Sequence, residues 1–494
     1  MLRSTSSAQS AEWWRGASSR LAHHSAGWAV AALISLGPFA PLGAIAAQSG
    51  DALHGLARRD EVEAVNLDSL VARAIAVHPA IRAASSRVDA ASSRVSPAGA
   101  WPDPMLMAGI QNLPVSRARG ALADPHGAPS PVPSGADPMT MKMVGVSQTI
   151  PYPGKLSLQR RVAEREVMAA EASLDGTRRR IAREMRDAYY DLAFIDRALG
   201  IVGRNQGVLV SLIRVTETRY GVGTAGQQDV LKARVEASRL AETAVSLTEE
   251  RRAALARLNA LLDQPSDVPL AETAIPTRIV RAAVAGSASE IRFVSAALGA
   301  RAADSPLPPL AELQEMALHG SPELREHEAM IAAQAARVEL ARREALPDFD
   351  VSLQYGQRSG YPDMVTATVS VPIPIHRRRK QDQLATAAGS ELAALEAERH
   401  SRQNEIRADV ARLVSYLERS RTQLALYVKA VLPQSRASLA SATASYQVGK
   451  VELLTVLDDQ ATLFHYETEY FRALTDFAKT LAELERVVGK EILR

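Results

Sequence analysis

The chain has 494 residues, with 58 Lys and Arg against 55 Asp and Glu, so its formal net charge at pH 7 is only +3. It has no cysteine, which excludes disulfides, thiolate zinc sites, a cysteine nucleophile and a lipidated N-terminal cysteine. The near-neutral charge and the lack of a long basic block argue against a nucleic-acid partner.

Residues 1–47 have the composition of a secretory signal peptide. Three arginines give the basic start: Arg3, Arg15 and Arg20. An apolar stretch follows at 28–36, and a small-residue cleavage site at 44–46 places the cut after Ala46 or Ala47. No later stretch reaches the roughly 18 apolar residues of a spanning helix. We therefore expect an exported protein with a short N-terminal extension at 48–66.

The remaining chain contains one pattern twice, at 67–263 and at 310–494, with an equatorial linker at 264–309 between the copies. Each copy is predicted to run helix, strand pair, long helix, turn, helix. Three motifs occur in both copies and indicate the duplication. They are the Pro-Asp pairs at 102–103 and 347–348, the Val-Ser-x-x-Ile-Pro runs at 146–151 and 369–374, and the Tyr-x-Val-Gly turns at 220–223 and 446–449. A repeat of this kind predicts one interlocked fold.

Four strands are predicted, at about 103–112, 140–149, 348–357 and 364–373. The third strand alternates clearly: Phe349, Val351, Leu353 and Tyr355 against Asp348, Asp350, Ser352 and Gln354. About ten residues is the length of a membrane-spanning strand. Four strands cannot close on themselves, and open edges are not viable in lipid. We expect three chains to share one barrel of about twelve strands; hairpins on a soluble core are the alternative.

The helices after each strand pair are predicted to form long arms, at 155–262 and 377–490. Apolar residues spaced alternately by four and three, such as Ile181, Met185, Ala188 and Leu192, give a coiled-coil seam. A helix of roughly 60 residues is about 90 Å long, which is an arm rather than part of a globule. The fold class is therefore mainly α, with long paired coiled-coil arms and a small transmembrane β-barrel.

The paired strands, the paired arms and the two Tyr-x-Val-Gly turns resemble the TolC family of outer-membrane efflux ducts, over residues 67–494. The resemblance implies an outer-membrane homotrimer whose strands meet lipid and whose arms form a coiled-coil α-barrel through the periplasm. It also implies a periplasmic adaptor and an inner-membrane pump as partners. The segment Gln148 to Lys155 resembles the heavy-metal cation branch, which implies a cation pump of the RND type. That branch often carries a lipidated N-terminal cysteine, which this chain lacks.

The resemblance also implies roles for residues at the arm tips. The adaptor would dock on the two turns: Tyr220, Gly221, Gly223, Tyr446 and Gly449. Near the tips, Asp229 and Tyr446 would face each other and hydrogen-bond to hold the periplasmic end shut. Asp458 would contribute to a ring of carboxylates in the pore, and Thr455 lies where many relatives have a second acid. In the alternative, Asp229 is an ordinary first-turn residue favoured by the helix dipole.

Four methionines give a clue to the substrate. When the first repeat is laid on the second, Met105 falls at Asp350, Met107 at Ser352, Met141 at Met364 and Met143 at Thr366. All four then face the lumen, where thioethers suit soft cations such as Cu(I). In the alternative, they only fill space or a one-residue slip turns them to lipid.

The sequence contains no catalytic motif, such as H-E-x-x-H or G-x-S-x-G, and no phosphate-binding loop. We therefore expect no enzyme activity and no cofactor. The favoured function is a passive exit duct for heavy-metal cations such as copper or silver. The alternatives are a duct for organic compounds or drugs and a periplasmic coiled-coil scaffold.

Overall fold

The computed structural model describes residues 66–112, 140–284, 307–358 and 360–493, all within one compact unit, Val62–Arg494. The predicted signal peptide, the extension before Asn66 and the first hairpin tip lie outside these residues. None of the described helices has both the length and the apolar character needed to cross a membrane.

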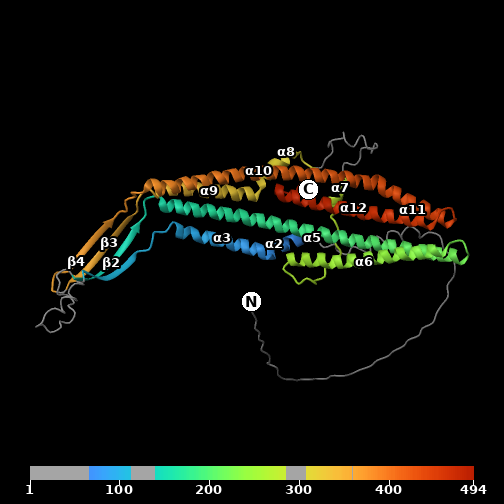
Figure 1. Cartoon of the computed structure of the whole chain (residues 1–494), viewed down its shortest axis with the longest axis horizontal. Coiled ribbons are helices and arrows are strands. Elements are labelled where there is room, and N and C mark those ends of the chain that lie inside the picture. Colours follow the sequence, from blue (N-terminus) through green and yellow to red (C-terminus); the bar gives the residue numbers. More distant parts are fainter. Residues whose placement is uncertain (1–65, 113–139, 285–306, 359, 494) are drawn as a thin grey trace, which may run out of the picture. The chain divides into compact units, whose positions relative to one another are not determined.

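The chain is mainly helical with one small sheet, which confirms the predicted fold class (Figure 1). The first repeat contains α2 (Leu67–Val77), α3 (Pro79–Ala98), β1 (Met105–Gln111), β2 (Met141–Ile150), α5 (Lys155–Gly221) and α6 (Gln227–Leu261), and α7 (Thr277–Val284) follows in the linker. The second contains α8 (Leu310–Gly320), α9 (Pro322–Arg343), β3 (Phe349–Arg358), β4 (Met364–Ser370), a 3₁₀ turn η1 (Arg377–Arg379), α10 (Gln381–Leu426), a π-helix η2 (Tyr427–Val431), α11 (Leu432–Gln447) and α12 (Leu453–Val488).

The two repeats begin with the same helix break. In the first repeat, the Nδ1 atom of His78 accepts the Ala80 N–H at 3.1 Å, and Pro79 opens α3. In the second, the hydroxyl of Ser321 accepts the Leu324 N–H at 3.3 Å, and Pro322 opens α9. A capping acceptor followed by proline is a favourable start because the first helical N–H groups lack partners inside the helix.

The sheet is antiparallel with strand order β1-β2-β3-β4. Within the described part of the chain, β1 and β4 have no strand beyond them, so both edges are open. β4 ends at Ser370, three residues earlier than expected. The prolines at 372 and 374 explain this, because proline has no N–H to donate to a neighbouring strand.

Directly paired residues of an antiparallel sheet point to the same side, so the register divides the sheet into two faces. We call one side the apolar face; its members include Leu106, Ile110, Val144, Val146, Val351, Leu353, Val365 and Val369. All eight are exposed within the chain. The opposite side, the polar face, carries Ser147, Asp350, Ser352, Gln354, Thr366 and Thr368. The chain thus presents a large apolar surface that requires another environment than water.

A partly buried ion pair fixes the sheet to the helices. The Nζ of Lys155, at the start of α5, lies 2.8 Å from Oδ1 of Asp348, just before β3. The Lys155 side chain is only 10% exposed, and the same carboxylate oxygen accepts the Tyr152 N–H at 2.7 Å. The two repeats are therefore tied together where the strands pass into the arms.

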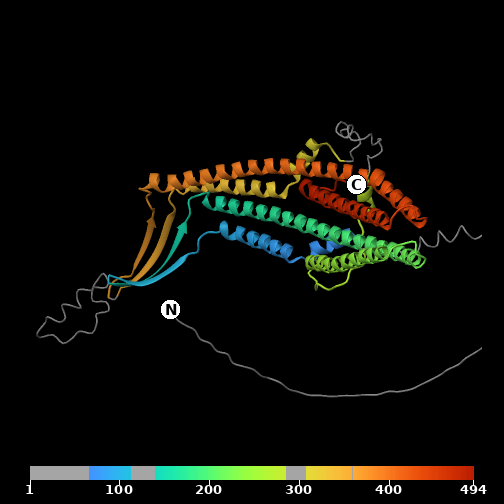
Figure 2. The same ribbon diagram turned by 45° about the vertical axis from the view of Figure 1, so that its right-hand side comes forward.

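The arms pack along α5, whose 67 residues extend about 100 Å. In both views α5 runs beside α9, α6, α3 and α12 (Figures 1 and 2). A large apolar core lies along its middle and includes Ile181, Met185, Leu192, Phe477, Leu481 and Leu484. A smaller core lies toward the turns and includes Leu209, Ala233, Leu240, Leu453 and Val456. Most positions of the predicted seam along α5 are buried, although Leu199, Gln206 and Ile213 are half-buried and Tyr220 is exposed.

The second arm is interrupted where the first is continuous. The π-helix η2 separates α10 from α11, and Pro433 follows in the first turn of α11. Proline inside a helix lacks an N–H and clashes with the carbonyl four residues before it, which favours a local rearrangement. This explains why the buried seam of α10 stops at Leu424.

Candidate functional site

The two arm turns have the same geometry. Gly223 and Gly449 have φ values of +75° and +77°, a region that favours glycine. Each donates its N–H to the carbonyl of the tyrosine three residues earlier, Tyr220 or Tyr446, at 3.0 Å. Both turns lie at the end of the helices opposite the sheet (Figures 1 and 2). The valines between the tyrosine and glycine, at 222 and 448, are 71% and 68% exposed.

The Tyr446 hydroxyl has a different partner from the one expected. The side chain is 2% exposed, and its hydroxyl donates to Oγ1 of Thr216 at 3.1 Å. Thr216 in turn donates to the Leu212 carbonyl at 2.9 Å. The expected hydrogen bond to Asp229 is therefore not formed within the chain, because the single phenolic proton is already donated inside the core.

Other contacts hold Tyr446 in place. The guanidinium of Arg219 lies over its ring, 4.5 Å from the ring centroid, and also donates to the Tyr446 carbonyl. Asp229 is half-buried in the first turn of α6, the location expected under the alternative interpretation. Tyr446 thus joins α11 to α5 rather than to α6.

Thr455 and Asp458 are exposed in the first turns of α12. Their neighbours Leu453, Val456 and Leu457 are buried against the smaller core. The two polar side chains therefore point away from the core of their own chain. An anionic ring formed by Asp458 stays a prediction.

A second buried polar contact, missed from the sequence, joins α5 to α12. The Gln460 amide donates to Oδ1 of Asn205, and Asn205 donates to the Ile201 carbonyl at 2.9 Å. Both side chains are about 5% exposed: 6% for Asn205 and 5% for Gln460. The available signal was a polar residue, Gln460, at a position of the predicted coiled-coil seam. The spacing of the seam did not identify Asn205 as its partner.

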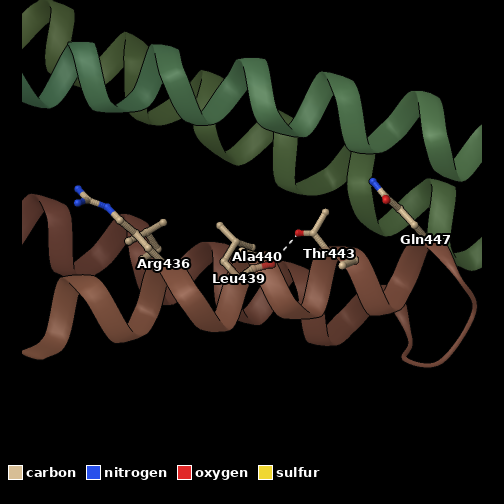
Figure 3. Close-up of a pocket in the computed structure, with 7 residues that line it drawn as sticks. Arg436, Leu439, Ala440, Thr443 and Gln447 are labelled. Atoms are coloured by element: carbon tan, nitrogen blue, oxygen red, sulfur yellow. Dashed lines mark hydrogen bonds between the residues drawn. The ribbon is translucent and has the colours of Figure 1, made fainter.

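A groove of about 450 Å³ lies on the second arm between the π-helix and the turn (Figure 3). It is lined by Arg436, Leu439, Ala440, Thr443, Ala444, Gln447 and Leu463. Arg436 is the single ionisable residue among them, and it donates to Glu467 at 2.8 Å. A groove with this lining has no pair of groups for acid–base chemistry.

The four sequence-predicted methionines lie on the polar face. Met105 and Met107 pair with Ser147 and Gly145 on β2, while Met141 and Met143 belong to β2 itself. Their exposure differs, because Met105 is 62% exposed and Met141 only 8%. Among the described residues, no group of three His, Asp or Glu side chains is arranged to hold a metal ion.

The comparison with known families matches residues 70–264 and 313–490, one segment in each repeat, to "Outer membrane efflux protein". The chain belongs to this family. It is an outer-membrane exit duct of a tripartite efflux system and not an enzyme. Members of the family form trimeric channels that work with periplasmic adaptors and inner-membrane RND pumps. Membership of this family excludes the alternative function of a periplasmic coiled-coil scaffold.

Individual family members show the same likeness. The chain is 22% identical over 342 residues to the cobalt-zinc-cadmium resistance protein CzcC of Cupriavidus metallidurans, covering 68% of this chain and 74% of that protein. The structure of CusC matches with a TM-score of 0.68 at 15% identity, covering 86% of this chain and 92% of CusC. That of VceC from Vibrio cholerae matches at 0.67 and 17%, covering 86% and 96%.

Proposed function

We propose that this outer-membrane efflux protein is the exit duct for heavy-metal cations. It would act as a homotrimer, together with a periplasmic adaptor and a cation-exporting RND pump. The observation that carries the proposal is the set of methionines on the polar face of the sheet. The likeness to a cobalt-zinc-cadmium resistance protein supports the same class of substrate.

Methionine is an unusual choice for a surface that would contact water. The other members of the polar face are mostly hydroxyl, amide and carboxylate side chains, which interact with any hydrated solute. Thioethers are weak hydrogen-bond acceptors but good ligands for soft metal ions. Since these positions alternate with residues on the apolar face, their chemistry concerns the solute rather than the surrounding lipid.

A strain lacking the chain should lose resistance to heavy-metal salts. Growth is measured in graded copper, silver, cobalt, zinc and cadmium salts, and in organic dyes. Loss of copper and silver resistance is expected from the methionines, whereas loss limited to cobalt, zinc and cadmium would favour the cargo named for CzcC. Loss of resistance to organic compounds alone would contradict the proposal.

The methionines are tested by changing Met105, Met107, Met141 and Met143 together to leucine. Copper or silver resistance should fall while the yield of trimer is unchanged, because leucine has a similar volume but no sulfur. Met330→Leu is the matched control, since Met330 is a 37% exposed methionine on α9, away from the sheet. Equal resistance in the fourfold variant and the control would indicate that the methionines only fill space.

The open edges of the sheet support a shared assembly. Unpaired strand edges are not tolerated in lipid, so β1 and β4 require strands from other chains. Native mass spectrometry of detergent-extracted protein should give three chains. A monomer that is stable when fully inserted in a bilayer would contradict this part of the proposal.

For the adaptor we propose the two turns, with Tyr220, Gly221, Gly223, Tyr446 and Gly449 shaping the surface. Tyr446 is buried, so it would maintain the turn, and the exposed Val222 and Val448 would make contact. Changing both valines to aspartate should abolish resistance and adaptor co-purification without dissociating the trimer. Normal co-purification would exclude the turns as the docking site.

A further inference from the structure

The polar face carries a fifth methionine, Met364 on β4, in a pattern that the first four do not reveal. In one row across the four strands, Gly109 pairs with Met143, Met143 with Gly356, and Gly356 with Met364. Met141 lies two residues before Met143 on the same face. Gly356 has no side chain, so it leaves a space on the polar face. Met143 and Met364 lie on either side of this space, and Met141 lies diagonally across from it.

The third methionine occupies this gap. The Sδ atom of Met141 lies 2.6 Å from the position that a Cβ atom on residue 356 would take. Its side chain is therefore folded over Gly356, and Met141 is 8% exposed. The Met143 and Met364 backbones are two strand spacings apart, or about 10 Å. Two flexible side chains can span this distance and bring their sulfur atoms to the Met141 sulfur.

We propose that Met141, Met143 and Met364 form a three-thioether site for a soft monovalent cation, Cu(I) or Ag(I), over Gly356. This inference rests on the proposed function and names its substrate class. Neutral sulfur ligands select Cu(I)-like ions, whereas Zn²⁺ prefers thiolate, imidazole or carboxylate ligands. Desolvation also costs more for a divalent ion than for a monovalent one when no ligand is charged.

The positive side chain that pairs with Met141 across the strands is directed toward the hairpin tip. Arg358 pairs with Met141 in the register, but its guanidinium donates to the Pro362 carbonyl at 2.8 Å and lies 5.7 Å from the ring centroid of Tyr361. The Asp363 carboxylate accepts the Arg358 N–H at 3.2 Å and adds a compensating negative charge close by. The Arg358 guanidinium is therefore held by residues of the hairpin tip, and the Asp363 carboxylate partly offsets its charge.

Purified full-length protein in detergent is titrated with Ag(I), and with Cu(I) in competition with a chromophoric Cu(I) chelator. We expect one ion per chain, with a sulfur-dominated X-ray absorption spectrum for Cu(I). Changing Met141, Met143 and Met364 to leucine should weaken binding at least tenfold. Changing Met330 to leucine should not, because Met330 lies on α9, away from the sheet.

A pair of glycine variants tests the geometry without removing sulfur. Gly356→Ala places a methyl group where the Met141 sulfur lies, so binding should weaken in the same direction as for the leucine variants. Gly109→Ala lies in the same cross-strand row, yet its methyl group would meet nothing within 4 Å, so binding should be unchanged. Trimer yield, measured for each variant, separates misfolding from loss of the site.

The inference is overturned if wild-type protein binds no more Ag(I) or Cu(I) than the threefold leucine variant, or if the two glycine variants behave alike. Its failure is distinguishable from failure of the proposed function. A copper-sensitive deletion strain whose purified duct binds no Cu(I) would leave the function standing and remove the site. Specific Cu(I) binding by the purified duct, together with a deletion strain that keeps its metal resistance, would leave the site standing and remove the proposed function.

Discussion

Asp187 on α5 is a carboxylate whose removal should stabilise the protein at neutral pH. It is 7% exposed, and its Oδ2 atom lies 2.9 Å from Arg183, while Oδ1 is buried without a hydrogen-bond partner. Burial raises the pKa of Asp187 from 3.8 to about 6, against the attraction of Arg183 and Lys479 and with the repulsion of Glu483 and Asp191.

The size of the effect follows from linkage. A shift of about two pKa units corresponds to about 3 kcal/mol per chain between the protonated and the ionised form. The raised pKa means that this stability is present below about pH 4 and is lost as the pH rises through about 6. Asparagine resembles the protonated form at every pH. Asp187→Asn should therefore add up to about 3 kcal/mol at pH 7.5 and almost nothing at pH 4.

The assay is the thermal unfolding midpoint of purified trimer, followed by circular dichroism between pH 4 and 8. The difference between variant and wild type should grow as the pH rises. Asp191→Asn is the matched control, because Asp191 is paired with Lys479 and lies 3.5 Å from Arg257. It should not raise the midpoint. A difference for Asp187→Asn that is independent of pH, or a lower midpoint at pH 7.5, would refute the reasoning.

Three further predictions concern the arm tips. Tyr446→Phe removes the hydrogen bond to Thr216, which should cost about 1 kcal/mol and raise single-channel conductance in planar bilayers; unchanged conductance would exclude a gating role for this contact. Asp458→Asn should lower cation selectivity in the same recordings, and an unchanged reversal potential would remove the proposed anionic ring. Gly449→Ala, at φ +77°, should destabilise by about 1 kcal/mol. Gly221→Ala should be tolerated in an unfolding measurement, since its methyl group would meet nothing within 4 Å.

The sequence predicted best the features that depend on the periodic spacing of apolar and polar residues. The alternation around Phe349 and Asp350 has period two, so it located β3 to within a residue at each end. The first repeat is less regular, because Met and Gly stand where the second has polar residues. Its strands were nevertheless found by matching the repeats, and the register places the four methionines on the polar face.

What the sequence could not predict depends on distant partners. Tyr446 and Thr216 are 230 residues apart, and Gln460 and Asn205 are 255 apart. Heptad spacing shows that such residues face a neighbouring helix, but not which polar group they meet. The predicted Tyr446–Asp229 contact followed from a family resemblance, and it was wrong within the chain because the phenol is buried toward α5. The π-helix before Pro433 was missed for a similar reason, since one proline does not specify how a helix rearranges.

The order of pairing in the sheet has a consequence for biogenesis. The central pair joins β2 to β3, and its contact between Thr149 and Asp350 spans 201 residues, so it cannot form until the whole first arm and the helices α8 and α9 have been synthesised. Helices form from local contacts and fold quickly, whereas pairing at this separation is slow. The newly exported chain therefore passes through a stage in which helices have formed but β2 and β3 are not yet paired. Unpaired strands of this kind bind one another readily, so this stage is where chaperones and proteases compete for the chain.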